Sequence, residues 1–325
     1  MKILFRVDGN QNIARCLALA SGLKETEPIS EILFCGSNSI KDQVLANNFS
    51  YKELGSPFEI GMEDLEAIIE QEQIQILIID FKRITENHIN HLSKKVLLVV
   101  FDDGSVVHCN AKILVNPNIY AHLIRYTMGD ETELLLGTEF YPLLSEFDQH
   151  EDFERTISDS VKHILIDLED DGAITVQIIQ ILKDLKDHFS VTIVTGKNFI
   201  KGEDLAKLIG LDGRFIVLQD PDPIKRFSIA DIAITNQNWF NEIMFFRLPS
   251  LVIGPKSNLL DYIGKNELAL TLMGTPNNDE MRSVVFTLFK DKNTRENISK
   301  RLFELIDNLG RFRLANEILE SYKSI

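Results

Sequence analysis

Carboxylates that directly follow or close short apolar runs are the first residues in this chain with an evident chemical use. Two carboxyl groups held close together can raise the pKa of one of them, which suits that group to act as a general acid or base. An Asp at the end of a strand also caps the next helix without any ligand, so a structural role stays open for each. The carboxylates in question are Asp8, Asp80, Asp102 and Asp103.

A second set of residues could hold a ligand in the other half of the chain. Trp239, the only tryptophan, could stack on a base or a sugar ring, or pack in a core. Glu242 lies in the first turn of a predicted helix, where the helix dipole favours a carboxylate even without a ligand. Gly196 precedes Lys197, which could meet a phosphate, although a lone Gly-Lys lacks the frame of a phosphate-binding loop. Asn12 could bond a ligand or serve a turn.

The sequence predicts no metal and no cofactor. His88 and His91 lie about one helical turn apart, but no third ligand accompanies them. The cysteines, Cys16, Cys35 and Cys109, form no C-x-x-C pair and no cluster with histidine at zinc spacing.

Short runs rich in Ile, Val and Leu alternate with longer amphipathic segments, a pattern typical of buried parallel strands joined by helices. In the first half we expect strands at 2–7, 31–35, 74–80, 96–102 and 113–115, and helices at 13–23, 39–47, 62–72 and 86–94. In the second half we expect strands at 163–167, 190–194, 214–218, 232–235 and 250–253, helices at 174–188, 203–209, 223–229 and 240–246, and a closing helical region at 294–322. Ligands bind at the carboxyl ends of strands in open parallel sheets, and the candidate residues fall there.

A chain of 325 residues exceeds what one hydrophobic core usually serves, so two domains are expected. The charge-dense stretch 148–160 lacks apolar periodicity and divides them. The sequence therefore predicts an α/β protein with a Rossmann-like domain at 1–147, a linker at 148–160 and a second Rossmann-like domain at 161–325. Whether the last helix crosses back to the first domain stays open.

Charge and hydropathy exclude several classes of partner. The net charge of −15 argues against nucleic acid, which is bound mainly through Lys and Arg. The apolar runs have the length of strands rather than the roughly 20 residues of a membrane span. Met1 leads directly into a strand-like run without the features of a signal peptide, so we expect a cytoplasmic protein.

Several segments spread over most of the chain form one framework. They are the first strand and helix, 3–9 and 15–20, the strand ends 77–80, 101–103 and 115–118, the junction 136–147, and the segment 229–253. In this framework the chain resembles the UDP-sugar hydrolase of bacterial pseudaminic acid biosynthesis and its spore-coat polysaccharide relatives, which belong to the GT-B superfamily together with the peptidoglycan lipid glycosyltransferase. The resemblance implies two parallel-sheet domains facing a cleft and a UDP-sugar as ligand.

The loops depart from that family. Its members carry G-x-G-H-x-x-R across the first turn, and counting back from Arg15 the histidine position holds Asn12 and the preceding glycine position Gln11. A neutral amide cannot replace an imidazole in proton transfer near neutral pH. Residues 169–171, all acidic, stand where the family has a Gly-Gly turn, and 236–239 replace a Gly-Gly-Ser-Thr turn.

The resemblance assigns roles to the positions that remain. Glu242 matches the residue that bonds the ribose hydroxyls in the superfamily, and Asn258 lies near the family's Asn-Gln pair. The candidate catalytic residues are Asp8, Asn12 and Asp80. The candidate nucleotide- or sugar-binding residues are Arg15, Asp103, Gly196, Asn236, Trp239, Glu242 and Asn258.

Three functions follow as hypotheses. The first is a UDP-sugar hydrolase-like protein of nonulosonic acid or surface-polysaccharide biosynthesis, in which water displaces UDP with Asp8 or Asp80 as base. The second is an inactive GT-B-fold binding or scaffold protein that partners an enzyme of the same pathway. The third is a glycosyltransferase that uses a different donor.

Overall fold

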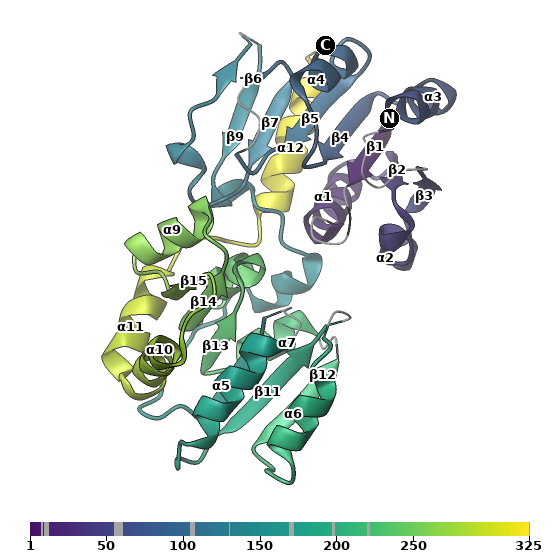
Figure 1. Cartoon of the computed structure of the whole chain (residues 1–325). Coiled ribbons are helices and arrows are strands. Elements are labelled where there is room, and N and C mark those ends of the chain that lie inside the picture. The colour runs from purple at the N-terminus through teal and green to yellow at the C-terminus, as the bar shows by residue number, and fades with distance from the viewer. Residues whose placement is uncertain are drawn as a thin grey trace. The chain divides into compact units, whose positions relative to one another are not determined.

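The computed structural model describes residues 1–7, 9, 13–54, 61–104, 108–129, 131–168, 172–196, 199–219 and 222–324 (Figure 1). The chain folds into two compact units. The first comprises Met1–Glu151 together with Asp307–Ile325, and the second comprises Asp152–Ile306. Each unit contains its own parallel sheet flanked by helices.

The first unit is built on a seven-stranded parallel sheet in the order β3-β2-β1-β4-β5-β7-β9. Its strands are β1 (Lys2–Val7), β2 (Glu31–Gly36), β3 (Ser50–Glu53), β4 (Ile76–Asp80), β5 (Leu97–Phe101), β7 (Ile113–Asn116) and β9 (Glu133–Leu136). Its helices are α1 (Ile13–Thr26), α2 (Lys41–Ala46), α3 (Met62–Glu72), α4 (Glu86–Leu92) and α12 (Gly310–Lys323). Two short strands, β6 (His108–Cys109) and β8 (Thr127–Met128), pair with each other beside it.

Side chains that alternate along the buried strands form two cores, one on each face of this sheet. Phe5 and Ile78 pack on one face with residues of α1 and α12, including Leu19 and Ile318. Leu4, Leu77 and their neighbours pack on the other face with α3 and α4. Because successive side chains of a strand point to opposite faces, strands covered on both sides are continuous apolar runs.

The second unit has a six-stranded parallel sheet in the order β12-β11-β10-β13-β14-β15. Its strands are β10 (His163–Asp167), β11 (Ser190–Thr195), β12 (Phe215–Gln219), β13 (Ile232–Thr235), β14 (Ser250–Gly254) and β15 (Leu270–Met273). Its helices are α5 (Ala173–Lys183), α6 (Gly202–Ile209), α7 (Pro223–Ile229), the 3₁₀ turn η5 (Gln237–Trp239), α8 (Phe240–Phe245), α9 (Asn258–Lys265), α10 (Asn278–Lys290) and α11 (Lys292–Arg301).

Both sheets reverse their strand order at one point. In the first sheet the chain moves outward from β1 through β2 to β3 and then returns to β4, which lies on the other side of β1. In the second sheet it moves from β10 through β11 to β12 and returns to β13 beside β10. Ligands in open parallel sheets bind outside the carboxyl ends of the strands at such a switch point. The fold thus directs attention to the ends of β1, β4, β10 and β13.

The structure confirms the predicted class, two Rossmann-like units with parallel sheets. The predicted strands at 2–7, 163–167 and 232–235 have the observed bounds. The sequence did not predict β3, β9, β15, α9 or α10, and the closing helical region is two separate helices, α11 and α12.

The C-terminal helix corrects the predicted division of the chain. We expected 161–325 to form one domain, whereas 307–325 belongs to the first unit. Helix α12 packs against α1 (Figure 1) and contributes Leu314, Ile318 and Leu319 to a core of that unit. Burying a side chain such as Ile318 stabilises the fold by about 2 kcal/mol. The apolar stripe of α12 predicts that one face of the helix is buried, but it does not indicate which sheet that face packs against.

Two glycines allow the close approach of this helix. A Cβ on Gly22 in α1 would lie 2.9 Å from the Arg311 carbonyl oxygen, and a Cβ on Gly310 would lie 2.2 Å from that of Tyr141. The fully buried Arg311 guanidinium donates to Asp148 Oδ1 at 2.8 Å.

Among the described helices, none is long and apolar enough to cross a membrane.

Candidate functional site

Arg15 and Asp80 form a bidentate ion pair at the switch point of the first sheet. Arg15 comes from α1, and Asp80 closes β4 opposite Val7 of β1. The Nε of Arg15 donates to Asp80 Oδ2 at 2.6 Å, and Nη2 donates to Oδ1 at 2.7 Å. The Asp80 side chain is only 2% exposed and the Arg15 side chain 10%. Both oxygens of the predicted base are therefore occupied by a guanidinium.

Asp103 supplies a second carboxylate to the same guanidinium. Arg15 donates to it from Nη1 at 2.9 Å and from Nη2 at 3.2 Å. The Asn118 amide donates to Asp103 Oδ1 at 2.8 Å, and the Phe101 ring lies 5.0 Å below the Arg15 guanidinium carbon. The Asp103 side chain is 40% exposed. Of the two carboxylates on Arg15, this is the one that a ligand can reach.

Asp102, Tyr126 and Asn116 extend the network along the carboxyl ends of the strands. The Tyr126 hydroxyl donates to Asp102 Oδ2 at 2.9 Å and accepts from the Asn116 amide at 2.8 Å. Asn116 Oδ1 in turn accepts from the Asn118 amide at 2.8 Å. Burial raises the pKa of Tyr126 above its usual range, and Asp102 adds to this effect. The phenol therefore keeps its proton at neutral pH and holds Asp102 in place.

Burial and the shared guanidinium shift the two acids of this cluster in opposite directions. Burial raises the pKa of Asp80, and Arg15 offsets that effect only in part. Burial also acts on Asp103, but Arg15 and Asn118 outweigh it and hold the pKa of Asp103 below its usual value. Burial, with the Asp80 carboxylate next, raises the pKa of the Cys16 thiol well above its usual value. Asp103 is thus a carboxylate at neutral pH, and Cys16 is a thiol.

A second Asp–Arg pair lies at the switch point of the other sheet. Asp167, the last residue of β10, forms an ion pair with Arg226 of α7 at 2.9 Å, and both side chains are buried. The Arg226 guanidinium carbon stands 4.4 Å from the centre of the Trp239 ring. Phe227 lies 5.7 Å from the same ring. One part of Trp239 is therefore already packed against protein, and its buried indole N–H has no hydrogen-bond partner among the described residues.

The residues after β13 bind to neighbouring loops of the second unit. Asn236 accepts from the Asn238 backbone N–H at 2.8 Å and donates to the Leu168 carbonyl oxygen at 2.7 Å. The Ser257 hydroxyl donates to Gln237 Oε1 at 2.5 Å. These contacts fix the turn after β13 to the loops after β10 and β14, all at the carboxyl edge of the sheet.

Other predicted residues lie apart from this group or outside the described part of the chain. Glu242 is half-buried in the first turn of α8. Asn258 is the exposed first residue of α9, after the capping Ser257. Gly196 follows β11, and a Cβ there would meet no atom within 4 Å. Asp8 and Asn12, like residues 169–171 and Lys197, lie outside the described residues.

The structure therefore brings together three predicted residues of the first unit, Arg15, Asp80 and Asp103. The sequence reasoning missed Arg226, because an Arg in a short helix gives no signal of an ionic partner. It also did not single out Asp167 as a site residue, although that Asp closes a predicted strand.

Within the described residues, no group of three or more His, Cys, Asp and Glu side chains could hold a metal ion.

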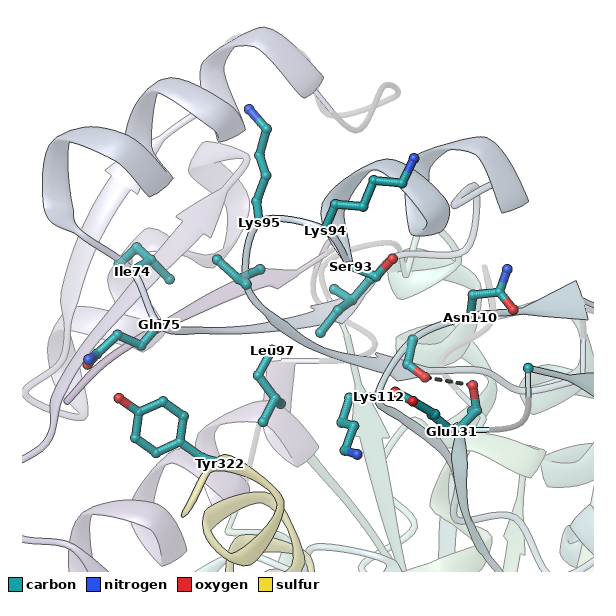
Figure 2. A pocket seen from close by; sticks show the side chains of 15 residues that line it. Ile74, Gln75, Ser93, Lys94, Lys95, Leu97, Asn110, Lys112, Glu131 and Tyr322 are labelled. Atoms are coloured by element: carbon teal, nitrogen blue, oxygen red, sulfur yellow. Dashed lines mark hydrogen bonds between the residues drawn. The ribbon is translucent and has the colours of Figure 1, made fainter. Parts of the chain in front are cut away.

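A cavity of about 770 Å³ lies at the opposite edge of the first sheet, where β4, β5 and β7 begin (Figure 2). Its lining includes Lys94, Lys95, Lys112 and Tyr322. In Figure 2 the side chains of Lys94 and Lys95 extend away from Tyr322 and Lys112, so these ammonium groups do not converge on one point. The cavity is separate from the switch point of the first sheet, which lies at the carboxyl ends of these strands.

Comparisons with known proteins give the fold and not the family. No protein-family model matches the chain, and no curated protein sequence matches it. Solved structures match over nearly the whole chain. MurG of Acinetobacter baumannii is 12% identical, with a TM-score of 0.67, and the match covers 98% of this chain and 99% of MurG.

Two further structures widen the range of activities in this fold. The spinosyn rhamnosyltransferase SpnG is 8% identical, with a TM-score of 0.67, over 97% of this chain and all of SpnG. A putative UDP-N-acetylglucosamine 2-epimerase from Listeria monocytogenes is 13% identical, with a TM-score of 0.68, over all of this chain and 96% of that one. The chain thus has the GT-B type of fold. These comparisons lend no support to the hydrolase that the sequence resemblance implied.

Proposed function

We propose that this protein is a glycosyltransferase of the GT-B type that takes its sugar from a nucleoside diphosphate. The observation that carries the proposal is the position of Asn236, Trp239 and Glu242 directly after β13, at the switch point of the second sheet. That is where an open parallel sheet binds its ligand. Similar folds have been solved with such a ligand, SpnG with thymidine diphosphate and VinC with dTDP.

The second unit would hold the nucleotide of the donor. A carboxylate such as Glu242 can accept hydrogen bonds from two neighbouring hydroxyls of a ribose. The turn at 236–238 is fixed by Asn236 and by the Gln237–Ser257 hydrogen bond, so a ligand would not have to order it. A preformed site avoids part of the entropic cost of binding.

The first unit would hold the acceptor or the sugar. Arg15 donates four hydrogen bonds to Asp80 and Asp103 out of the five that a guanidinium can donate. The fifth N–H, on Nη1, can reach a substrate oxygen beside the exposed Asp103. In this scheme Asp80 orients Arg15, while Asp103 and Arg15 bond hydroxyl groups of the bound molecule.

Calorimetric titration with UDP, dTDP and their sugar conjugates tests the nucleotide site. We expect micromolar binding of at least one nucleotide, and a loss of at least tenfold in affinity with Glu242→Ala, since a hydrogen bond to a charged group contributes about 1.5–3 kcal/mol. Glu280→Ala is the matched control, because Glu280 is an exposed first-turn carboxylate of α10 in the same unit. Absence of heat with every nucleotide at millimolar concentration would overturn the proposal.

Turnover of the bound donor separates transfer from the other hypotheses. A glycosyltransferase releases the nucleotide faster when an acceptor with free hydroxyl groups is added. Release at one rate with water alone, whatever the acceptor, would instead indicate a hydrolase. Binding of the donor without release under any condition would indicate an inactive binding protein.

A further inference from the structure

Large apolar side chains of the second unit are exposed on either side of α6 in the sequence and in β12. Leu211 is fully exposed, and Ile200 is 75% exposed. In β12 itself Ile216, Val217 and Leu218 are 51%, 45% and 40% exposed. Ile216, Val217 and Leu218 are consecutive in one strand, and adjoining exposed apolar residues mark an interaction site more often than scattered single residues do.

β12 is also an open edge of its sheet. Within the described part of the chain it pairs with β11 alone, so every second residue turns its backbone N–H and C=O away from the sheet. Natural edge strands usually carry charged residues or proline that prevent pairing with another strand. The edge strand β3 of the first sheet has Lys52 and Glu53. β12 reads Phe-Ile-Val-Leu-Gln and has no such residue.

The exposure of both faces of β12 indicates what kind of partner could cover it. Ile216 and Leu218 point to one face of the sheet and Val217 to the other. A lone helix or a flat surface would leave the backbone edge unpaired, whereas a strand pairs with that edge and places its own side chains on both faces. A second copy of this chain presents such a strand in β12, whose apolar side chains would meet the same apolar side chains in an antiparallel pair.

We propose that two copies of the chain associate through β12, antiparallel and related by a two-fold axis, so that their six-stranded sheets form one continuous sheet. Full overlap of the strand with itself places Val217 of one copy opposite Val217 of the other. It also places Ile216 opposite Leu218 on the same face, an apolar cross-strand pair. The association is closed, because each chain contributes one copy of the same surface.

Light scattering after gel filtration of the full chain, over a range of concentrations, tests the association. We expect the mass of two chains for the natural protein. Val217→Lys should raise the dissociation constant at least about 100-fold, because it sets two like charges opposite each other. Ile29→Lys is the matched control, since Ile29 is 79% exposed in the first unit. Circular dichroism should show both variants folded, as neither position is buried.

A disulfide at the two-fold axis tests the register. Val217→Cys should form a covalent dimer under mild oxidation, whereas Ile29→Cys should not; the three natural cysteines are buried. A natural protein with the mass of one chain at about 50 µM, a concentration well above the dissociation constant of a stable dimer, would overturn the proposal. A Val217→Lys variant that stays dimeric, or open-ended assembly into larger species, would overturn it as well. None of these outcomes depends on the proposed glycosyl transfer.

Discussion

Arg15 is shared by two carboxylates that differ mainly in their access to water. Asp80 is buried at the end of β4, so its ionised form depends on the guanidinium. Asp103 meets the same guanidinium from a position that is 40% exposed, where water still solvates it. The same chemical group therefore has a structural role at one position and stays accessible to a ligand at the other.

Asp80→Asn should destabilise the first unit far more than Asp103→Asn. Removing Asp80 leaves the buried Arg15 with only the partly exposed Asp103 as its counter-charge, and breaking a buried ion pair costs about 3 kcal/mol. An exposed pair contributes less than about 1 kcal/mol. The two variants make the same change on the same arginine, so they control for each other in urea unfolding. Equal losses of unfolding free energy would contradict this account.

The contribution of Asp103 to stability should depend on pH with a defined sign. Its pKa in the folded protein is below the usual value of 3.8, so its contribution is present above that pH and is lost as the pH falls through the folded pKa. We expect the difference in melting temperature between the natural protein and Asp103→Asn to be constant above about pH 5 and to shrink at lower pH. Asp80 is present in both proteins, so its titration largely cancels. A difference that does not change with pH would contradict the ion pair.

Part of the candidate site could be predicted from the residues alone. Asp80 and Asp103 follow apolar strands, and parallel strands place their carboxyl ends at one edge, so their proximity follows from the pattern. Arg226 could not be predicted, because its partner Asp167 is distant in sequence. The packing of Arg226 on Trp239 could not be predicted either, because the two residues lie in different elements, α7 and η5.

Among the elements, buried strands were easier to predict than edge strands. The residues Ile76–Ile79 of β4 and all of β5 are continuous apolar runs because both faces of these strands pack in a core. β3 contains Lys52 and Glu53, and β9 begins with Glu133, since an edge strand contacts water. Such residues weaken the pattern that identifies a strand. The surface against which α12 packs could not be predicted either, because an apolar stripe does not identify the partner of a helix.

Gly310→Ala tests the close packing of α12 at its first residue. A Cβ at this position would lie 2.2 Å from the Tyr141 carbonyl oxygen, which belongs to the backbone and cannot rotate away. We expect a loss of about 2 kcal/mol, the usual cost of overpacking, and faster proteolysis of the C-terminal segment. Gly202→Ala is the control, because Gly202 opens α6 and a Cβ there would meet nothing within 4 Å. The idea fails if both alanines are tolerated equally.

At the scale of the whole molecule, the two units have the same architecture. Each has a parallel sheet whose strand order reverses at one point, with a buried Asp–Arg pair at that point. They differ in how the chain completes them. The second unit is one continuous segment, Asp152–Ile306, whereas the first needs both ends of the chain. Ile318 and its neighbours in α12 fill a core that begins with Ile3 and Phe5.

This discontinuity sets an order of events on the ribosome. Domains generally fold as units while the chain is being made, usually the N-terminal one first. Here the N-terminal sheet is synthesised early, but one of its cores stays open until residues 307–325 have emerged. The second unit, although made later, can finish folding sooner. The nascent first unit must therefore expose apolar surface for the time that translation of the second takes, and this is the interval in which a chaperone would be needed.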